Sequence, residues 1–473
     1  MKPCDRSLFL VILSMGFALF PAKSEAESES GFRLATFSAD VTPPLGHTLF
    51  TGRWKPAEAI ESPLEARGWV LLPPGKSGEK PIVCCVVDWS EIRNDAYDRW
   101  RDALAEAAGT TRERTFVSTI HQHDTPLADL EAQRILEAAG SKHQVIDLEF
   151  HEKIVVRVAT ALRESLASAE KITHLGTGRG RVEQIASNRR YQLADGTVRY
   201  NRMSSTHDLS ARRAPEGEID PFVSALSFWN ADHAIAVLSV YATHPMSYYG
   251  NGIVGSDFPG IARAARQTAT PGTFQIYASG CSGNVTAGKF NDGSPENRPI
   301  LAKRLEEGMA AALAATKRVP LSSMEFRLER VRLEPRESRG FSVAELQAVI
   351  ASDGDARAHG MAALGLSWRA RADDPAYDID LPALKLNDGS VNLLLLPGEI
   401  YVEYQLAAQA MAPDAFVMTL GYGESAPGYL PIERAWAEND SNLGDWCWVA
   451  PGMEERMTAA IRSLLQKKAT PIP

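Results

Sequence analysis

Short apolar runs alternate along this chain with longer segments whose apolar residues recur at helical spacing. Runs bounded by Gly, Pro or polar residues predict strands at 32–38, 68–72, 81–89, 115–120, 222–230, 234–241, 274–278, 391–396 and 416–420. Helical spacing predicts helices at 94–108, 150–169, 299–315, 400–412 and 453–467. The order strand, helix, strand over 81–120 is typical of a βαβ unit. We therefore expect an α/β protein in which a mixed β-sheet core is flanked by helices.

Two further patterns concern local structure in the second half of the chain. Asp388-Gly389 predicts a tight hairpin between strands at 383–386 and 391–396. The first of these strands is expected to begin only after Pro382, because proline is poorly tolerated inside a ladder. The segment 340–375 has alternating charge and predicts exposed helices, either a lid or a solvated helix pair.

The N-terminus has the three-part pattern of a secretory signal. Lys2 and Arg6 precede an apolar run at 8–20, and small residues then lead to a cleavage site after Ala26. The run is shorter than the roughly 20 residues that a membrane span needs. We expect a signal peptide at 1–26, a single domain at 27–473, and a secreted or periplasmic location.

Composition restricts the partners. The chain has 473 residues, 44% of them hydrophobic, and a formal net charge of −9, which argues against nucleic acid as a partner. A small neutral or amphiphilic ligand stays open, as does the oligomeric state. Among the cysteines, Cys84 and Cys85 lie in an apolar run and are expected in the core, while a bridge between Cys281 and Cys447 is left open.

Metal-ligating side chains follow several predicted strands directly. His121 and His123 end the run at 115–120, and side-chain alternation along a strand would turn both to one face. His244 follows the run at 234–241 and Glu399 the run at 391–396, while Tyr422 and Tyr429 are rival candidates after the last strand. Such nitrogen and oxygen donors suit Zn²⁺, which predicts a metal site at the strand ends. The other histidines are expected at the surface: His47, His143, His151, His174, His207, His233 and His359.

A set of short motifs resembles the neutral (non-lysosomal) ceramidase family over most of residues 32–435. The motifs are DVTPP at 40–44, STIHQH at 118–123, ATHP at 242–245, GNVT at 283–286, PGE at 397–399 and the loop at 421–431. The resemblance implies one zinc ion held by His121, His244, Glu399 and Tyr429. It also implies that His123 transfers protons beside the metal and that Arg189, with Arg190 as an alternative, holds the scissile group.

This sequence departs from the family pattern at two places. The Ser-Gly-Pro that follows the family's histidines is Asp124-Thr125-Pro126 here, and a later loop also differs. The family's Gly-Asp-Val-Ser-Pro-Asn is Gly283-Asn284-Val285-Thr286-Ala287-Gly288 here, so Thr286 would replace the family's serine as an orienting hydroxyl. The resemblance implies an exported zinc hydrolase that cleaves the amide bond of a small amphiphilic N-acyl substrate such as ceramide, with peripheral membrane contact left open. The alternatives are a zinc esterase and a non-catalytic binding protein that keeps the fold.

Overall fold

The computed structural model describes residues 1, 31–75 and 77–466. The predicted signal peptide therefore lies outside the described residues, apart from Met1. Within the described part, none of the helices is long and apolar enough to cross a membrane.

The first sheet contains the predicted βαβ unit. Its strands are β1 (Arg33–Asp40), β3 (Glu65–Leu72), β4 (Ile82–Val87), β6 (Thr115–Thr119) and β8 (Glu170–Lys171), in the order β6-β4-β3-β1-β8. Strands β4 and β6 are parallel, and α2 (Asn94–Ala108) connects them, as predicted. The helix ends at Gly109, whose φ of +66° is a left-handed conformation that glycine adopts without strain.

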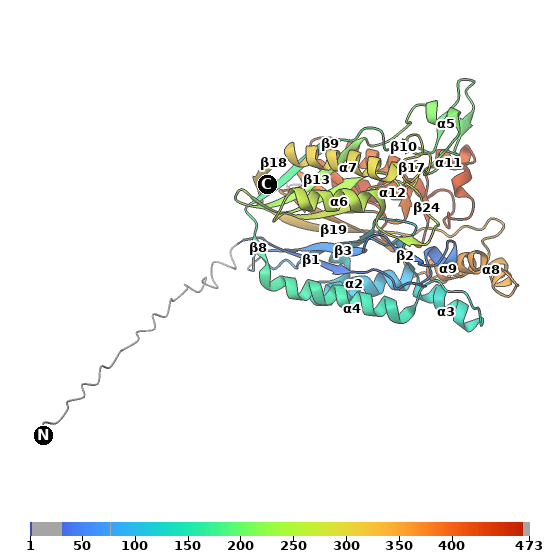
Figure 1. Ribbon diagram of the computed structural model, residues 1–473, viewed down its shortest axis with the longest axis horizontal. Coiled ribbons are helices and arrows are strands. Elements are labelled where there is room, and N and C mark those ends of the chain that lie inside the picture. The colour runs from blue at the N-terminus through green and yellow to red at the C-terminus, as the bar shows by residue number, and fades with distance from the viewer. Residues whose placement is uncertain (2–30, 76, 467–473) are drawn as a thin grey trace, which may run out of the picture.

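The second sheet has the order β16-β14-β13-β9-β18. Its strands are β9 (His174–Arg181), β13 (Phe222–Asn230), β14 (His233–Tyr241), β16 (Phe274–Ser279) and β18 (Lys317–Pro320). Helices α6 (Asp257–Ala269) and α7 (Asn297–Ala314) cover one face of it (Figure 1). Glycines in β9 let α7 approach closely, because a Cβ on Gly178 would lie 2.1 Å from the backbone oxygen of Ala312.

The two sheets pack face to face between outer helices (Figure 1). Alternation along β4 shows the arrangement: Cys84 faces the core shared with β13, β14 and β16, whereas Cys85 faces α2 and α4 (Leu148–Ser165). Both thiols are fully buried, which confirms their predicted place in the core. The fold is thus a mixed α/β architecture with helices, two sheets and helices in successive layers.

A third sheet carries the predicted hairpin. Its order is β19 (Met324–Val331), β20 (Ile379–Leu386), β21 (Val391–Leu395) and β23 (Phe416–Leu420), with α10 (Val402–Met411) and α12 (Met453–Leu465) nearby. The turn residues Asn387, Asp388 and Gly389 all have positive φ, as a tight hairpin requires. The prediction that the strand starts after Pro382 is wrong: β20 includes Pro382, at a position where only β19 pairs with it and β21 does not.

Several sequence expectations about exposure are also wrong. Segment 340–375 forms α8 (Val343–Ile350) and α9 (Ala356–Ala372), but α9 is largely buried. Its small residues and Trp368 pack in a core with Trp448. The lid interpretation therefore fails for α9, which is part of the interior.

Three histidines expected at the surface are buried, namely His47, His151 and His359. His151 lies on the inward face of α4 beside Trp89 and Trp100, so one polar residue on an otherwise apolar helical face was misassigned. The disulfide left open is not formed: Cys281 and Cys447 are both buried free thiols.

Candidate metal centre

Strand ends from all three sheets converge on one buried cluster. His121 follows β6, His244 follows β14, and Glu399 lies in β22 (Glu399–Ile400), just after β21. One ligand atom from each lies within 4.8 Å of the others, and all three side chains are buried. The predicted convergence of these three residues at the strand ends is confirmed.

The hydrogen bonds around the two imidazoles fix which nitrogens face the cluster. Nδ1 of His244 lies 2.7 Å from the backbone oxygen of Ser282, and Nδ1 of His121 lies 3.1 Å from that of Ser90. A carbonyl oxygen can only accept, so both Nδ1 atoms carry a proton, and the Nε2 atoms are the ones that face the cluster. Backbone partners of this kind orient metal-bound histidines in proteins.

The inward nitrogens of both histidines lie close to one carboxylate oxygen. Nε2 of His244 lies 2.9 Å and Nε2 of His121 3.3 Å from the same carboxylate oxygen of Glu399. Two imidazole nitrogens this close to one carboxylate oxygen need a positive charge beside it, carried either by their own protons or by a bound cation. Two imidazole nitrogens and one carboxylate with further room are the donor set of a catalytic zinc site, so the residues present fit the ion.

The surroundings shift the pKa of each donor. Burial alone would lower the pKa of His121, but the nearby Glu399 and Glu91 raise it above its usual value. Burial, with a contribution from the nearby Arg189, lowers the pKa of His244 to about 4. Burial alone would raise the pKa of Glu399, but the neighbouring His121 and His244 hold the pKa of this carboxyl well below its usual range. Deprotonated donors are what metal binding requires.

His123 lies at the edge of the cluster, but for a different reason from the predicted one. Strand β6 ends at Thr119, and His121 has a φ of +67°, so the two histidines do not alternate along a strand. The turn nevertheless brings their Nε2 atoms to 3.3 Å. The His123 ring packs against Phe50 and Tyr249, with ring centroids 4.5 and 4.8 Å away.

The two candidate tyrosines have different environments. The Tyr429 hydroxyl accepts a hydrogen bond of 2.6 Å from Arg189, and Tyr429 lies in β24 (Tyr429–Leu430), paired directly with Glu399 in β22. Tyr422 stacks its ring on His121 at 4.5 Å, and its hydroxyl is hydrogen-bonded to Ser282 at 2.7 Å. Of the two hydroxyls, the structure therefore brings that of Tyr429 to the cluster.

The two candidate arginines, Arg189 and Arg190, also differ in their contacts. Arg189 is buried and donates to Tyr429, and its other terminal nitrogen lies 3.0 Å from Nε2 of His244. Arg190 points elsewhere and forms a 2.6 Å ion pair with Glu438. Only Arg189 reaches the cluster.

Thr286 does not reach it. This residue lies in β17 (Val285–Thr286), paired with β10 (Ser187–Asn188), next to Arg189 in the sequence. Its hydroxyl lies 3.1 and 2.9 Å from the backbone oxygens of Arg202 and Met203. The side chain thus connects two loops beside the site.

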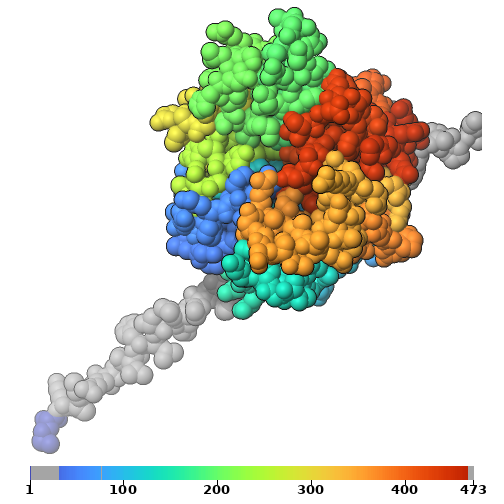
Figure 2. Space-filling model, turned by 90° about the vertical axis from the view of Figure 1, so that its right-hand side faces the viewer, coloured from blue at the N-terminus to red at the C-terminus, as the bar shows by residue number. Residues whose placement is uncertain are grey.

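A cavity of about 170 Å³ leads to the cluster, and His123, Arg189, Glu399 and Tyr429 line it. Its remaining wall includes four aromatic side chains: Phe50, Trp54, Tyr249 and Trp446. Figure 2 shows the N-terminal part of the chain (blue), the segment around residue 200 (green) and the C-terminal part (red) meeting on one face. Sequence reasoning missed Phe50, Trp54 and Tyr249, because they lie in a one-turn helix and in loops that have no periodic pattern.

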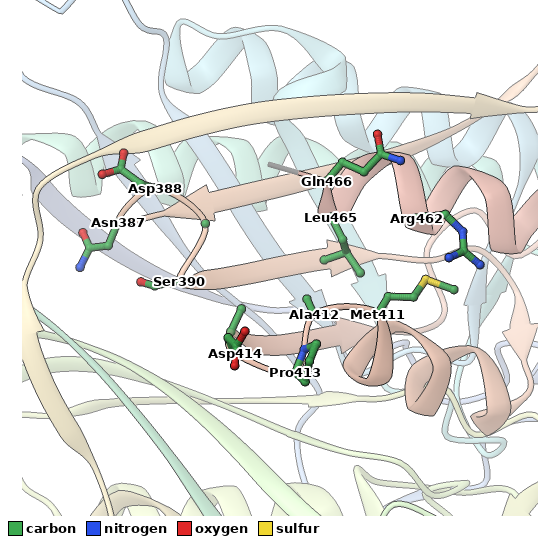
Figure 3. Close-up of a pocket in the computed structure, with 12 residues that line it drawn as sticks. Asn387, Asp388, Ser390, Met411, Ala412, Pro413, Asp414, Arg462, Leu465 and Gln466 are labelled. Carbon is green, nitrogen blue, oxygen red and sulfur yellow. The ribbon is translucent and has the colours of Figure 1, made fainter. Parts of the chain in front are cut away.

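A larger cavity, of about 510 Å³, lies at the β20–β21 hairpin, the end of α10 and the end of α12 (Figure 3). Its charged lining residues are Asp388, Asp414 and Arg462, and no histidine or cysteine lines it. The smaller cavity is therefore the better candidate for chemistry, although it holds less volume.

The fold and the site together define an α/β protein with a buried His-His-Glu centre at its strand ends. Solved structures of ceramidases have the same fold. A ceramidase complexed with C2 aligns over 93% of this chain and 77% of its own, with a TM-score of 0.66 and 17% identity. The neutral ceramidase from Pseudomonas aeruginosa aligns over 92% and 73%, with a TM-score of 0.63 and 17% identity. No family model and no curated protein matches the sequence.

Proposed function

We propose that this protein is an exported zinc-dependent hydrolase that cleaves the amide bond of a small N-acyl compound. The observation that carries the proposal is the convergence of ligand atoms from His121, His244 and Glu399 at the inner end of an aromatic cavity. The fold supports this proposal, because one of the solved structures that share it is a ceramidase complexed with C2. Export follows from the signal pattern in the sequence.

His121, His244 and Glu399 would hold the zinc ion, with Tyr429 beside them. A bound Zn²⁺ would polarise the carbonyl under attack and lower the pKa of water. The donor arrangement equally fits a zinc esterase, because an ester carbonyl is polarised in the same way.

The chain's own residues have separate tasks. Burial holds the pKa of His123 well below its usual range, so this imidazole is neutral at rest and readily passes to the leaving amine a proton that it receives during the reaction. Arg189 stays charged and places guanidinium hydrogens toward the oxygen that becomes negative. Arg189 is itself buried, which strengthens its electrostatic interactions. Thr286 would act by positioning the strand before Arg189, not through its hydroxyl on the substrate.

Hydrolysis assays test this function directly. The purified chain is treated with a chelator, zinc is restored, and release of acid from short N-acyl amines is followed. Activity should disappear with the chelator, return with zinc and fall at least 100-fold in His123→Gln. Full activity in His123→Gln would contradict the assigned proton transfer. A chain that binds zinc but cleaves no amide or ester would instead be a binding protein.

A further inference from the structure

The outer end of the catalytic cavity carries a pair of charged side chains among the aromatic walls. Arg53, which follows the short helix η1 (Phe50–Gly52), and Asp445 both line the cavity and lie 3.5 Å apart. Asp445 is bound more closely by Arg357 of α9, at 2.7 Å. Two guanidinium groups thus share one carboxylate at this end, which leaves one positive charge in excess.

Arg53 is held in place without using its hydrogen-bond donors. Its guanidinium carbon lies 5.5 Å from the ring centroid of Trp54 and 5.8 Å from that of Trp446. Its side chain is only 20% exposed. Across residues 31–75 and 77–466, the Arg53 guanidinium donates no hydrogen bond to another protein atom, its contact with Asp445 being the long ion pair.

Arg53 is mostly buried and has hydrogen-bond donors that no protein atom in the described part of the chain uses, so it is suited to bind an anion. The guanidinium presents five N–H groups in a planar fork that matches the two oxygens of a carboxylate. Arg189, the other arginine in the cavity wall, lies at the inner end beside Tyr429 and His244, where the proposed reaction needs its charge. Arg53 is therefore the group on which a ligand's negative charge would be satisfied.

The cavity also limits how far this anion lies from the reacting bond. The Phe50 ring contacts both Trp446, at 4.9 Å between centroids, and His123, at 4.5 Å. One aromatic ring thus separates the wall near Arg53 from the proton-transfer group. A volume of about 170 Å³ is below the roughly 300 Å³ at which pockets for drug-sized ligands begin.

We propose that the substrate is an N-acyl amino acid whose carboxylate binds Arg53 while its amide lies against His123. A carboxylate two bonds from the amide nitrogen has the short reach that the cavity allows. Ceramide has only hydroxyl groups near its amide, and it would leave the Arg53 donors without a charged partner. This inference rests on the proposed function and narrows its substrate class.

Paired ligands with the same acyl chain test the inference. N-hexanoyl glycine carries the carboxylate, and N-hexanoyl ethanolamine has a hydroxyl in its place. Wild-type kcat/KM should favour the glycine compound at least tenfold. Arg53→Gln should remove that preference, mainly by raising KM for the glycine compound. Arg318→Gln is the matched control, because Arg318 also lies over a tryptophan, Trp229, and pairs with an exposed aspartate, Asp232, but does not line the cavity.

Binding is measured separately with the ketone analogues of both compounds, in which a methylene replaces the amide nitrogen and cleavage is blocked. Calorimetry on the full-length mature chain should show the anionic analogue binding at least tenfold more tightly, and Arg53→Gln should abolish the difference. Selective, Arg53-dependent binding without hydrolysis would support this ligand class and refute the proposed function. Hydrolysis of both amides, or of C2-ceramide, at similar rates and unaffected by Arg53→Gln would support the function and overturn this inference.

Discussion

Replacing each of the two tyrosines near the metal centre with phenylalanine separates their roles. Tyr429→Phe removes the hydroxyl that accepts a 2.6 Å hydrogen bond from the buried, charged Arg189. Hydrogen bonds to charged groups contribute about 1.5–3 kcal/mol. At about 1.4 kcal/mol for each factor of ten, kcat/KM should fall roughly 10- to 150-fold.

Tyr422→Phe is the matched control, because it removes a neutral hydrogen bond to Ser282 and keeps the ring stacked on His121. The expected cost is about 1 kcal/mol of stability, with kcat/KM changed less than about threefold. Amide hydrolysis and zinc affinity, by competition with a chelator, are measured for both variants. Equal losses in the two variants, or a larger loss in Tyr422→Phe, would refute the assignment of Tyr429 to the site.

Two further predictions concern acid stability and packing. His151 has no hydrogen-bond partner among the described residues, and burial lowers its pKa from 6.5 to about 4. Below pH 6.5 the unfolded chain takes up this proton first, so stability should fall by up to about 3 kcal/mol between pH 6.5 and pH 4. Urea unfolding at pH 7.5 and pH 5 should show a smaller drop in His151→Phe, and an identical drop would contradict the assignment. A Cβ on Gly283 would lie 2.0 Å from the backbone oxygen of Glu399, so Gly283→Ala should displace this ligand. Zinc binding, measured by titration with a chelator, should weaken at least tenfold. Gly31→Ala is the control: its Cβ would have no atom nearer than 3.7 Å, so zinc binding should be unchanged.

Local patterns in the sequence predicted those elements whose formation depends on nearby residues. Helix α2 begins and ends at the predicted residues because its spacing and its Gly109 cap are both local signals. The hairpin at 387–389 is equally local. Burial is not local: α9 has a polar appearance, yet Trp368 and its small residues face a core assembled from distant strands. The same holds for His151, whose neighbours Trp89 and Trp100 lie far from it in sequence.

The candidate site could be predicted only in part. Placing His121, His244 and Glu399 after strands was enough to suggest convergence, because strand ends meet at the edges of sheets. Choosing between Tyr422 and Tyr429, or between Arg189 and Arg190, needed the hydrogen bonds, since each pair is close in sequence and alike in chemistry. Phe50, Trp54 and Arg53 lie on a loop with positive φ at Phe50 and Thr51, and no periodic signal indicates such a path.

The presence of a zinc ion at the His-His-Glu centre is the central claim, and elemental analysis of the purified mature chain tests it most directly. The wild type and His233→Ala, which alters an exposed histidine, should each contain about one zinc ion per chain. His244→Ala should lose it, because one of the converging nitrogen donors is removed. Equal zinc in His244→Ala and the wild type, or no metal in any of the three proteins, would contradict the account.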